Sequence, residues 1–160
     1  MRATDLLHRD HERVNELFRR LEQTPRNDTD TRQDLLDQIA DELEVHTKIE
    51  EEIFYPALRR VGASVDEAFE EHRKVSSLLG DAEGRDPGSD DFVLRVRELT
   101  RNVEHHVAEE EGPLFRDAER LGADELERLG TQLEDRKQAL KSSLVQRGLR
   151  AAKLAAKKVV

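Results

Sequence analysis

The sequence has no cysteine and no tryptophan, and it has one tyrosine and five phenylalanines among its 160 residues. The absence of cysteine excludes disulfides, thiolate nucleophiles, iron–sulfur clusters and cysteine-ligated zinc sites. Any metal bound by this chain must therefore use nitrogen and oxygen ligands. Because aromatic residues are scarce, the core must be built mainly from leucine, valine, isoleucine and alanine.

The sequence also lacks a long apolar run, and its first residues, MRATDLLHRDH, contain no apolar signal core. We therefore expect a cytoplasmic protein. The net charge is −9, with +6 in residues 141–160 and −15 in the rest of the chain. An acidic body repels phosphates, so nucleic acid is not an expected partner.

Apolar residues recur with helical spacing in several segments, although 39% of the residues are charged. The pattern predicts an all-α fold, an up-down four-helix bundle with an additional C-terminal helix. We expect residues 1–122 to form a metal-binding bundle and residues 123–160 to form the C-terminal helix with its basic tail. The expected helices span about 3–23, 31–61, 64–79, 90–121 and 124–144.

The sequence also indicates where two of these helices are interrupted and where a third begins. Pro56 lies inside the second helical pattern, so this helix must kink or lose its regular part near Tyr55. Gly112 and Pro113 interrupt the fourth pattern in the same way. Ser64 and Glu67 have the spacing of a capping box at the start of the third helix.

Four histidines each fall on the apolar stripe of a different expected helix. Two of them have a glutamate four residues later, which lies on the same side of a helix. The six residues are His11, His46, Glu50, His72, His106 and Glu110. Burying such groups without partners would cost several kcal/mol each. A metal ion, or a pair of ions, removes this cost, and these donors suit iron, manganese or zinc.

Spacing alone does not select these residues, since the H-x3-E string also occurs at His8 and His105. Those two histidines lie off the apolar stripes. We expect them at the surface, or at most in contact with a side chain that binds the metal. Each inward histidine, taken singly, is also compatible with a hydrogen-bonded core residue. The metal interpretation depends on all four facing inward together.

The sequence resembles the hemerythrin-like, or HHE cation-binding, domain over about residues 3–121. The segments that carry the resemblance are DLLHRDHERVNELF, ELEVHTKIEEEIFYPAL, EEHRKV and VEHHVAEEEGPLF. The resemblance implies a four-helix bundle that holds a non-haem di-iron centre, with Glu50 and Glu110 bridging the irons. Oxygen-carrying members have a further histidine where this chain has Ser76. Four histidines and two glutamates are then the implied ligand set, which disfavours reversible oxygen carriage.

The expected function is a di-iron protein that binds or reacts with a small oxidant, namely oxygen, hydrogen peroxide or nitric oxide. Decomposition of peroxide is one such reaction, but no separate acid or base residue indicates whether there is turnover. A redox or oxygen sensor, or an iron reservoir, is the alternative. A metal-free interaction bundle is a more remote one.

Three residues and the tail stay undecided at this level. Tyr55 is either a hydrogen-bonding group near the metals or a packing residue below the proline kink, and packing is the preferred interpretation. Glu51 and Glu111 follow the ligand glutamates directly, and solvation is the default for both. The basic tail is interpreted as a solvated helix end, with docking on an anionic membrane surface or a partner as the alternative. The sequence leaves homo-oligomerisation open.

Overall fold

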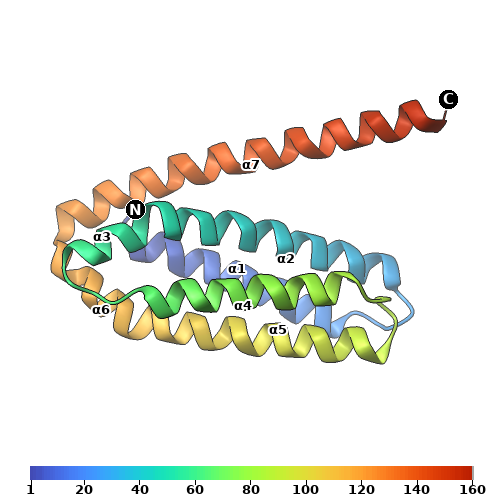
Figure 1. Ribbon diagram of the computed structural model, residues 1–160, viewed down its shortest axis with the longest axis horizontal. Coiled ribbons are helices and arrows are strands. Elements are labelled where there is room, and N and C mark those ends of the chain that lie inside the picture. The colour runs from blue at the N-terminus through green and yellow to red at the C-terminus, as the bar shows by residue number, and fades with distance from the viewer. Residues whose placement is uncertain (160) are drawn as a thin grey trace.

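The computed structural model describes residues 1–159, with side chains through residue 156. All elements of this part of the chain are helical, and four long helices form an up-down bundle with a fifth against its side (Figure 1). The all-α bundle with an added C-terminal helix is therefore confirmed. In chain order the elements are α1 Ala3–Gln23, α2 Thr29–Ile49, a π-helical turn Glu50–Phe54, α3 Tyr55–Arg60, α4 Asp66–Glu83, α5 Asp90–Glu109, a π-helical turn Glu110–Leu114, α6 Phe115–Ala118, a 3-10 turn Glu119–Leu121 and α7 Ala123–Val159.

The apolar stripes predicted from the sequence all face inward and form two separate clusters. One cluster fills the end of the bundle near α3, α6 and α7, and includes Leu7, Ile49 and Phe54. The other fills the opposite end near the α1–α2 and α4–α5 loops, and includes Val14 and Phe92. The polar stripe residues occupy the layer between the two clusters.

The first half of α7 packs on α1 and α2, and its Leu126, Leu129 and Leu133 belong to the buried core. Gly130 lies on the same face, where the N-terminus approaches so closely that a Cβ atom would be 1.9 Å from the backbone oxygen of Met1. Glycine is required here because any side chain would collide with that backbone.

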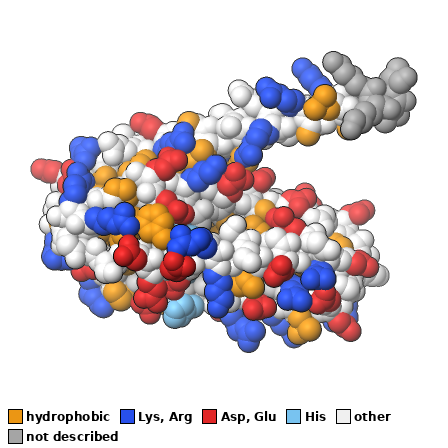
Figure 2. Space-filling view, viewed as in Figure 1, with side chains coloured by type: hydrophobic (Ala, Val, Ile, Leu, Met, Phe, Trp, Pro, Cys, Tyr) orange, Lys and Arg blue, Asp and Glu red, His pale blue; other side chains and the backbone are white. Residues whose placement is uncertain are grey.

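The second half of α7 diverges from the bundle (Figures 1 and 2). Val145, Leu149 and Leu154 are exposed there, between lysine and arginine side chains. The side chains of Lys157 and Lys158, part of the predicted basic tail, lie outside the described residues. None of the described helices combines the length and the apolar character needed to cross a bilayer.

The structure corrects two details of the predicted helices. Regular α-helix in the second segment ends at Ile49, six residues before Tyr55, because a π-helical turn separates it from Pro56. This turn accommodates the missing N–H and the bulk of the proline ring. The predicted capping box is wrong: α4 begins at Asp66 after Val65, which is buried, and no side chain caps it. Packing of Val65, rather than a Ser64 hydrogen bond, sets this end.

Candidate metal centre

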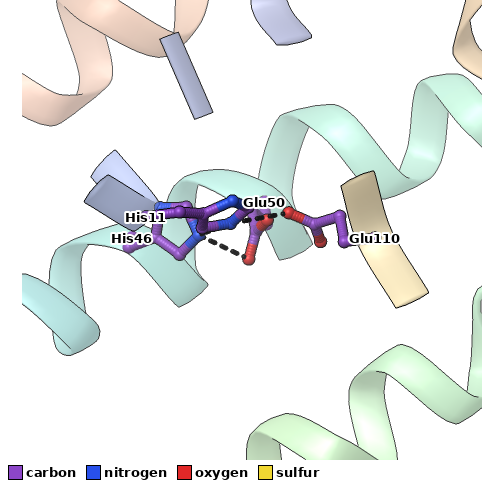
Figure 3. Close-up of side chains that lie close together, drawn as sticks. All are labelled: His11, His46, Glu50 and Glu110. Atoms are coloured by element: carbon purple, nitrogen blue, oxygen red, sulfur yellow. Dashed lines mark hydrogen bonds and ion pairs between the residues drawn. The ribbon is translucent and has the colours of Figure 1, made fainter. Parts of the chain in front are cut away.

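All six predicted ligands lie in the polar layer at the centre of the bundle. His11 comes from α1, His46 and Glu50 from α2 and its π-helical turn, His72 from α4, and His106 and Glu110 from α5 and its π-helical turn. The four histidines are at most 6% exposed, and both glutamates are fully buried. Figure 3 shows the first part of this layer, with the imidazoles of His11 and His46 pointing toward the two carboxylates.

The donor atoms divide into two groups that share one carboxylate. The first group contains His11, His46, Glu50 and Glu110, and the second contains Glu50, His72 and His106. In the first, the Nε2 atoms of His11 and His46 are 3.1 Å apart. In the second, the Nε2 atoms of His72 and His106 are also 3.1 Å apart. Oε1 of Glu50 lies 3.2 Å from Nε2 of His46 and 3.1 Å from Nε2 of His72. A carboxylate so placed can bridge two ions.

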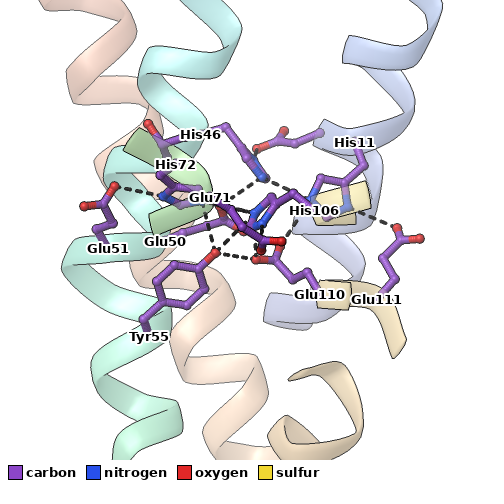
Figure 4. Close-up of polar contacts among 12 residues, drawn as sticks. His11, His46, Glu50, Glu51, Tyr55, Glu71, His72, His106, Glu110 and Glu111 are labelled. Carbon is purple, nitrogen blue, oxygen red and sulfur yellow. Dashed lines mark hydrogen bonds and ion pairs between the residues drawn. The ribbon is translucent and has the colours of Figure 1, made fainter. Parts of the chain in front are cut away.

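The outer nitrogen of each imidazole is held by a further carboxylate (Figure 4). Nδ1 of His46 donates to Asp10 at 3.0 Å, and Nδ1 of His11 donates to Glu111 at 3.1 Å. In the other half, Nδ1 of His72 donates to Glu51 and Nδ1 of His106 donates to Glu71, both at 2.9 Å. These bonds fix each ring with the proton outside and the Nε2 lone pair directed inward, as in carboxylate–histidine–metal triads.

The four outer contacts form a pseudo-repeat, in which the helix pair α1 and α2 is matched by the pair α4 and α5. Asp10 and Glu71 each directly precede the single histidine of α1 or α4, and each holds the histidine of the adjacent α2 or α5. Glu51 and Glu111 each directly follow a ligand glutamate, and each holds the single histidine of the other half. The site is thus built twice from one arrangement.

Three inner oxygen atoms indicate that this layer fits a cation. Both carboxylate oxygens of Glu50 and Oε1 of Glu110 are buried without a hydrogen-bond donor. When the imidazoles are neutral and donate outward through Nδ1, the inner nitrogens meet these oxygens lone pair to lone pair. Buried charges of this kind are paired or coordinate metals. The donor set and its geometry fit a metal centre.

Ionisation within the layer is strongly perturbed when no cation is present. Burial favours the neutral form of Glu50, but the His46 charge and contacts with Glu110 and His106 outweigh it and hold its pKa well below the usual range. Burial likewise acts to lower the pKa of His46, whereas Glu50 and Asp10 raise it well above its usual value. Burial and the neighbouring Glu50 charge raise the pKa of Glu110. One buried anion thus stays ionised while the second carboxylate tends to protonate.

Tyr55 belongs to this centre, so the preferred packing interpretation of this residue is incomplete. Its ring packs in the core against Phe54 and Phe69, and its hydroxyl donates to Oε2 of Glu110 at 2.5 Å. The hydroxyl oxygen of Tyr55 also lies 3.1 Å from Nε2 of His72. Burial and the nearby carboxylate charges raise the pKa of Tyr55 well above its usual value, so the hydroxyl keeps its proton.

The expectation that Glu51 and Glu111 are merely solvated is wrong, since both hold ligand histidines. Their position directly after the ligand glutamates was the available signal. His8 and His105 lie at the surface as expected, and they contact Glu111 and Glu71, respectively. Sequence reasoning missed Asp10 and Glu71, although each directly precedes a ligand histidine.

Comparison with known proteins agrees with this architecture. A DNA nickase of the cyanobacterium Nostoc is 33% identical over 150 residues, which are 92% of this chain and 41% of that protein. An uncharacterized protein of Mycobacterium tuberculosis is 35% identical over 79 residues, or 49% of this chain and 48% of that protein. The chain therefore spans less than half the length of these curated relatives.

The fold is also matched by a solved structure and by a family model. The crystal structure of a hemerythrin HHE cation-binding domain-containing protein from Mycobacterium kansasii superimposes with a TM-score of 0.82, at 25% identity and with 91% of each chain covered. The family model described as the hemerythrin HHE cation-binding domain matches residues 2–118, which include all six predicted ligand positions. The chain therefore belongs to the hemerythrin HHE cation-binding domain family.

Proposed function

We propose that this chain is a non-haem di-iron protein that binds or reacts with a small oxidant, namely oxygen, hydrogen peroxide or nitric oxide. The observation that carries the proposal is the convergence of four imidazole nitrogens on two buried carboxylates whose inner oxygens have no hydrogen-bond donor. Six protein donors distributed over two ions leave coordination positions open for a ligand. Manganese and zinc also accept these donors, and the iron assignment follows the family resemblance.

The space beside the centre favours a very small ligand. A cavity of about 20 Å³ adjoins the four histidines, and its remaining walls include Val14, Leu43, Val75 and Val103. This volume is close to what one water molecule needs. A diatomic molecule or a peroxide is of a size that this space favours, and the apolar wall disfavours ordered water.

Bound iron would supply electrons and an open coordination position to the oxidant. The chain's own residues would position the metal and exclude water from it. The outer carboxylates orient the imidazoles, Glu50 connects the two donor groups, and the two apolar clusters keep bulk water out. The hydroxyl of Tyr55 holds a proton within 2.5 Å of Glu110, where a hydrogen bond can be donated inside the site.

Two alternatives remain within the proposal. A redox or oxygen sensor, or an iron reservoir, would use the same centre without turnover. We do not extend the activity named for the Nostoc relative to this chain, because the match covers 41% of that protein and residues 1–140 carry a net charge of −15. A cytoplasmic location stays a prediction from the sequence.

The test is to load the metal-free chain with ferrous iron anaerobically, count the bound iron, and record the absorbance after oxidation. We expect about two irons per chain and oxo-bridged ferric absorption bands. Oxygen evolution on addition of peroxide would then indicate a catalyst, and iron release without gas evolution would indicate a reservoir. A chain that retains zinc but not iron would contradict the di-iron proposal.

A further inference from the structure

One ligand histidine is connected to a helix outside the bundle and outside the matched family segment. Asp10, which holds His46, is 4% exposed, and its second carboxylate oxygen accepts a hydrogen bond from Nζ of Lys137 at 2.5 Å. Lys137 lies on α7, and its side chain is 15% exposed. The chain of contacts runs from Lys137 through Asp10 and His46 to Glu50, the carboxylate common to both donor groups.

This contact distinguishes Asp10 from the other three outer carboxylates. Glu111 and Glu71 have exposed histidines as their further partners, His8 and His105. For Glu51 the only contact recorded among the described residues is the one with His72. Of the four, Asp10 is the least exposed and has the shortest side chain. Because its negative charge has the least access to water, Asp10 depends most on a nearby cation, here the ammonium of Lys137, for stabilisation.

The position of Lys137 follows from the way α7 is anchored. Leu126, Leu129 and Leu133 bury one stripe of α7, and Gly130 lets the N-terminus approach it. Lys137 comes four residues after Leu133 and therefore continues this stripe. The spacing predicts an apolar residue at this position, but the chain has a lysine. The largely buried side chain of Lys137 contacts Asp10 there.

We propose that α7 is part of the metal centre, and that Lys137 is a positioning residue that holds the Asp10 carboxylate against Nδ1 of His46. The ammonium group neutralises a buried anion close to two further carboxylates and fixes the oxygen that accepts the His46 proton. Without it, the ring of His46 is free to rotate or change tautomer, and its Nε2 is no longer held toward the metal position.

Loss of Lys137 should leave the fold intact. Asp10 and Lys137 line a groove of about 730 Å³ between α1 and α7, so water can reach Asp10 when the lysine is shortened or made neutral. The consequence should then appear in metal binding rather than in folding. Because the contact is specific to one donor group, it should weaken one of two ions more than the other.

The experiment compares Lys137→Gln, Lys137→Arg and the control Lys141→Gln in the full chain. Lys141 lies one turn later on α7, and its ammonium is 3.9 Å from Glu42, so the control loses the same charge without touching a ligand's partner. Each protein is loaded with Co²⁺, and release of the metal to a chelator is followed by the visible absorbance of cobalt. Melting of the metal-free proteins is recorded in parallel.

For Lys137→Gln we expect one of the two ions to be released about tenfold faster, with melting of the metal-free protein close to that of the wild type. Lys141→Gln should behave as the wild type, and Lys137→Arg should restore most of the retention. Equal release from Lys137→Gln and the wild type would overturn the inference, as would an equal loss in the control. If Lys137→Gln does not fold, Lys137→Arg alone provides the test. The inference is then overturned if Lys137→Arg does not retain both ions as the wild type does.

The inference rests on the proposed metal centre, and the two can fail separately. A wild-type chain that binds no Co²⁺ and no iron would overturn both. A wild-type chain that binds two ions, together with a Lys137→Gln variant that holds them equally well, would overturn only the role of Lys137.

Discussion

The hydroxyl of Tyr55 and Oε2 of Glu110 are 2.5 Å apart in the closed centre of the bundle, although the residues come from opposite halves of the chain. The equivalent position in the second half is Phe115, five residues after Glu110 as Tyr55 is five residues after Glu50. The pseudo-repeat thus carries a hydroxyl on one side and a phenyl ring on the other. The surroundings of the two donor groups are therefore chemically different.

Replacing Tyr55 by phenylalanine removes this donor while keeping the ring. In the metal-free protein the buried Glu110 oxygen then loses its partner, and we expect the free energy of unfolding to fall by about 1–3 kcal/mol. Chemical denaturation of the metal-free protein measures this change. An unchanged unfolding free energy would show that the ring matters only for packing.

The ligand set is expected to respond unequally to substitution, because Glu50 belongs to both donor groups and His72 to one. Glu50→Gln should therefore reduce metal at both positions, whereas His72→Ala should leave about one ion per chain. His105→Ala is the matched control, since this histidine is exposed and directly precedes a ligand. Metal analysis of the purified variants distinguishes them, and equal metal content in Glu50→Gln and His105→Ala would contradict the shared bridge.

Metal binding should release protons below about pH 9. Burial acts to lower the pKa of His106, but Glu50, Glu110 and Glu71 raise it to about 9 in the metal-free protein. The pKa of His46 is raised as well. Metals bind the neutral ring, so each ring must lose its proton, and the apparent affinity rises with pH until about 9. Calorimetric titration in buffers of different ionisation enthalpy measures the released protons, and a pH-independent affinity would argue against this linkage.

The packing of α7 provides a test that is independent of metals. Gly130→Ala places a methyl group against the backbone of Met1, and we expect a loss of about 1–3 kcal/mol in unfolding free energy. Gly148→Ala, on the same helix with no atom within 4 Å of the added Cβ, should be neutral or stabilising by up to about 1 kcal/mol. Denaturant unfolding of both variants measures these changes. Equal changes in unfolding free energy would mean that the N-terminus does not dock on α7.

Sequence periodicity was sufficient to locate the helices and the six inward donors. His11 and His72 share a row with buried leucine, valine or alanine neighbours one turn away, so the 3.6-residue period places their side chains correctly. The i, i+4 spacing from His46 to Glu50 runs from the regular helix to the first residue of the π-helical turn, and the backbone N–H of Glu50 still donates to the carbonyl oxygen of His46. These features are local, and local geometry can be derived from the sequence.

Tyr55 and the outer carboxylates could not be derived in the same way. An α-helical period places Phe54, not Tyr55, one turn below Glu50, and only the π-helical turn brings the hydroxyl into the site. Glu51 and Asp10 bond histidines on other helices, so their roles depend on how the helices pack against one another. Lys137 adds the position of a fifth helix, which periodicity alone does not give.

The measurement that tests the central claim most directly is the amount of iron bound per chain, determined together with the absorbance spectrum of the oxidised protein. We expect two irons per wild-type chain, with oxo-bridged ferric bands. Substitution of any buried histidine of the centre should lower the iron content, and substitution of His105 should not. A correctly folded chain that binds no iron, or whose iron is unaffected by substitution of the buried histidines, would contradict this account.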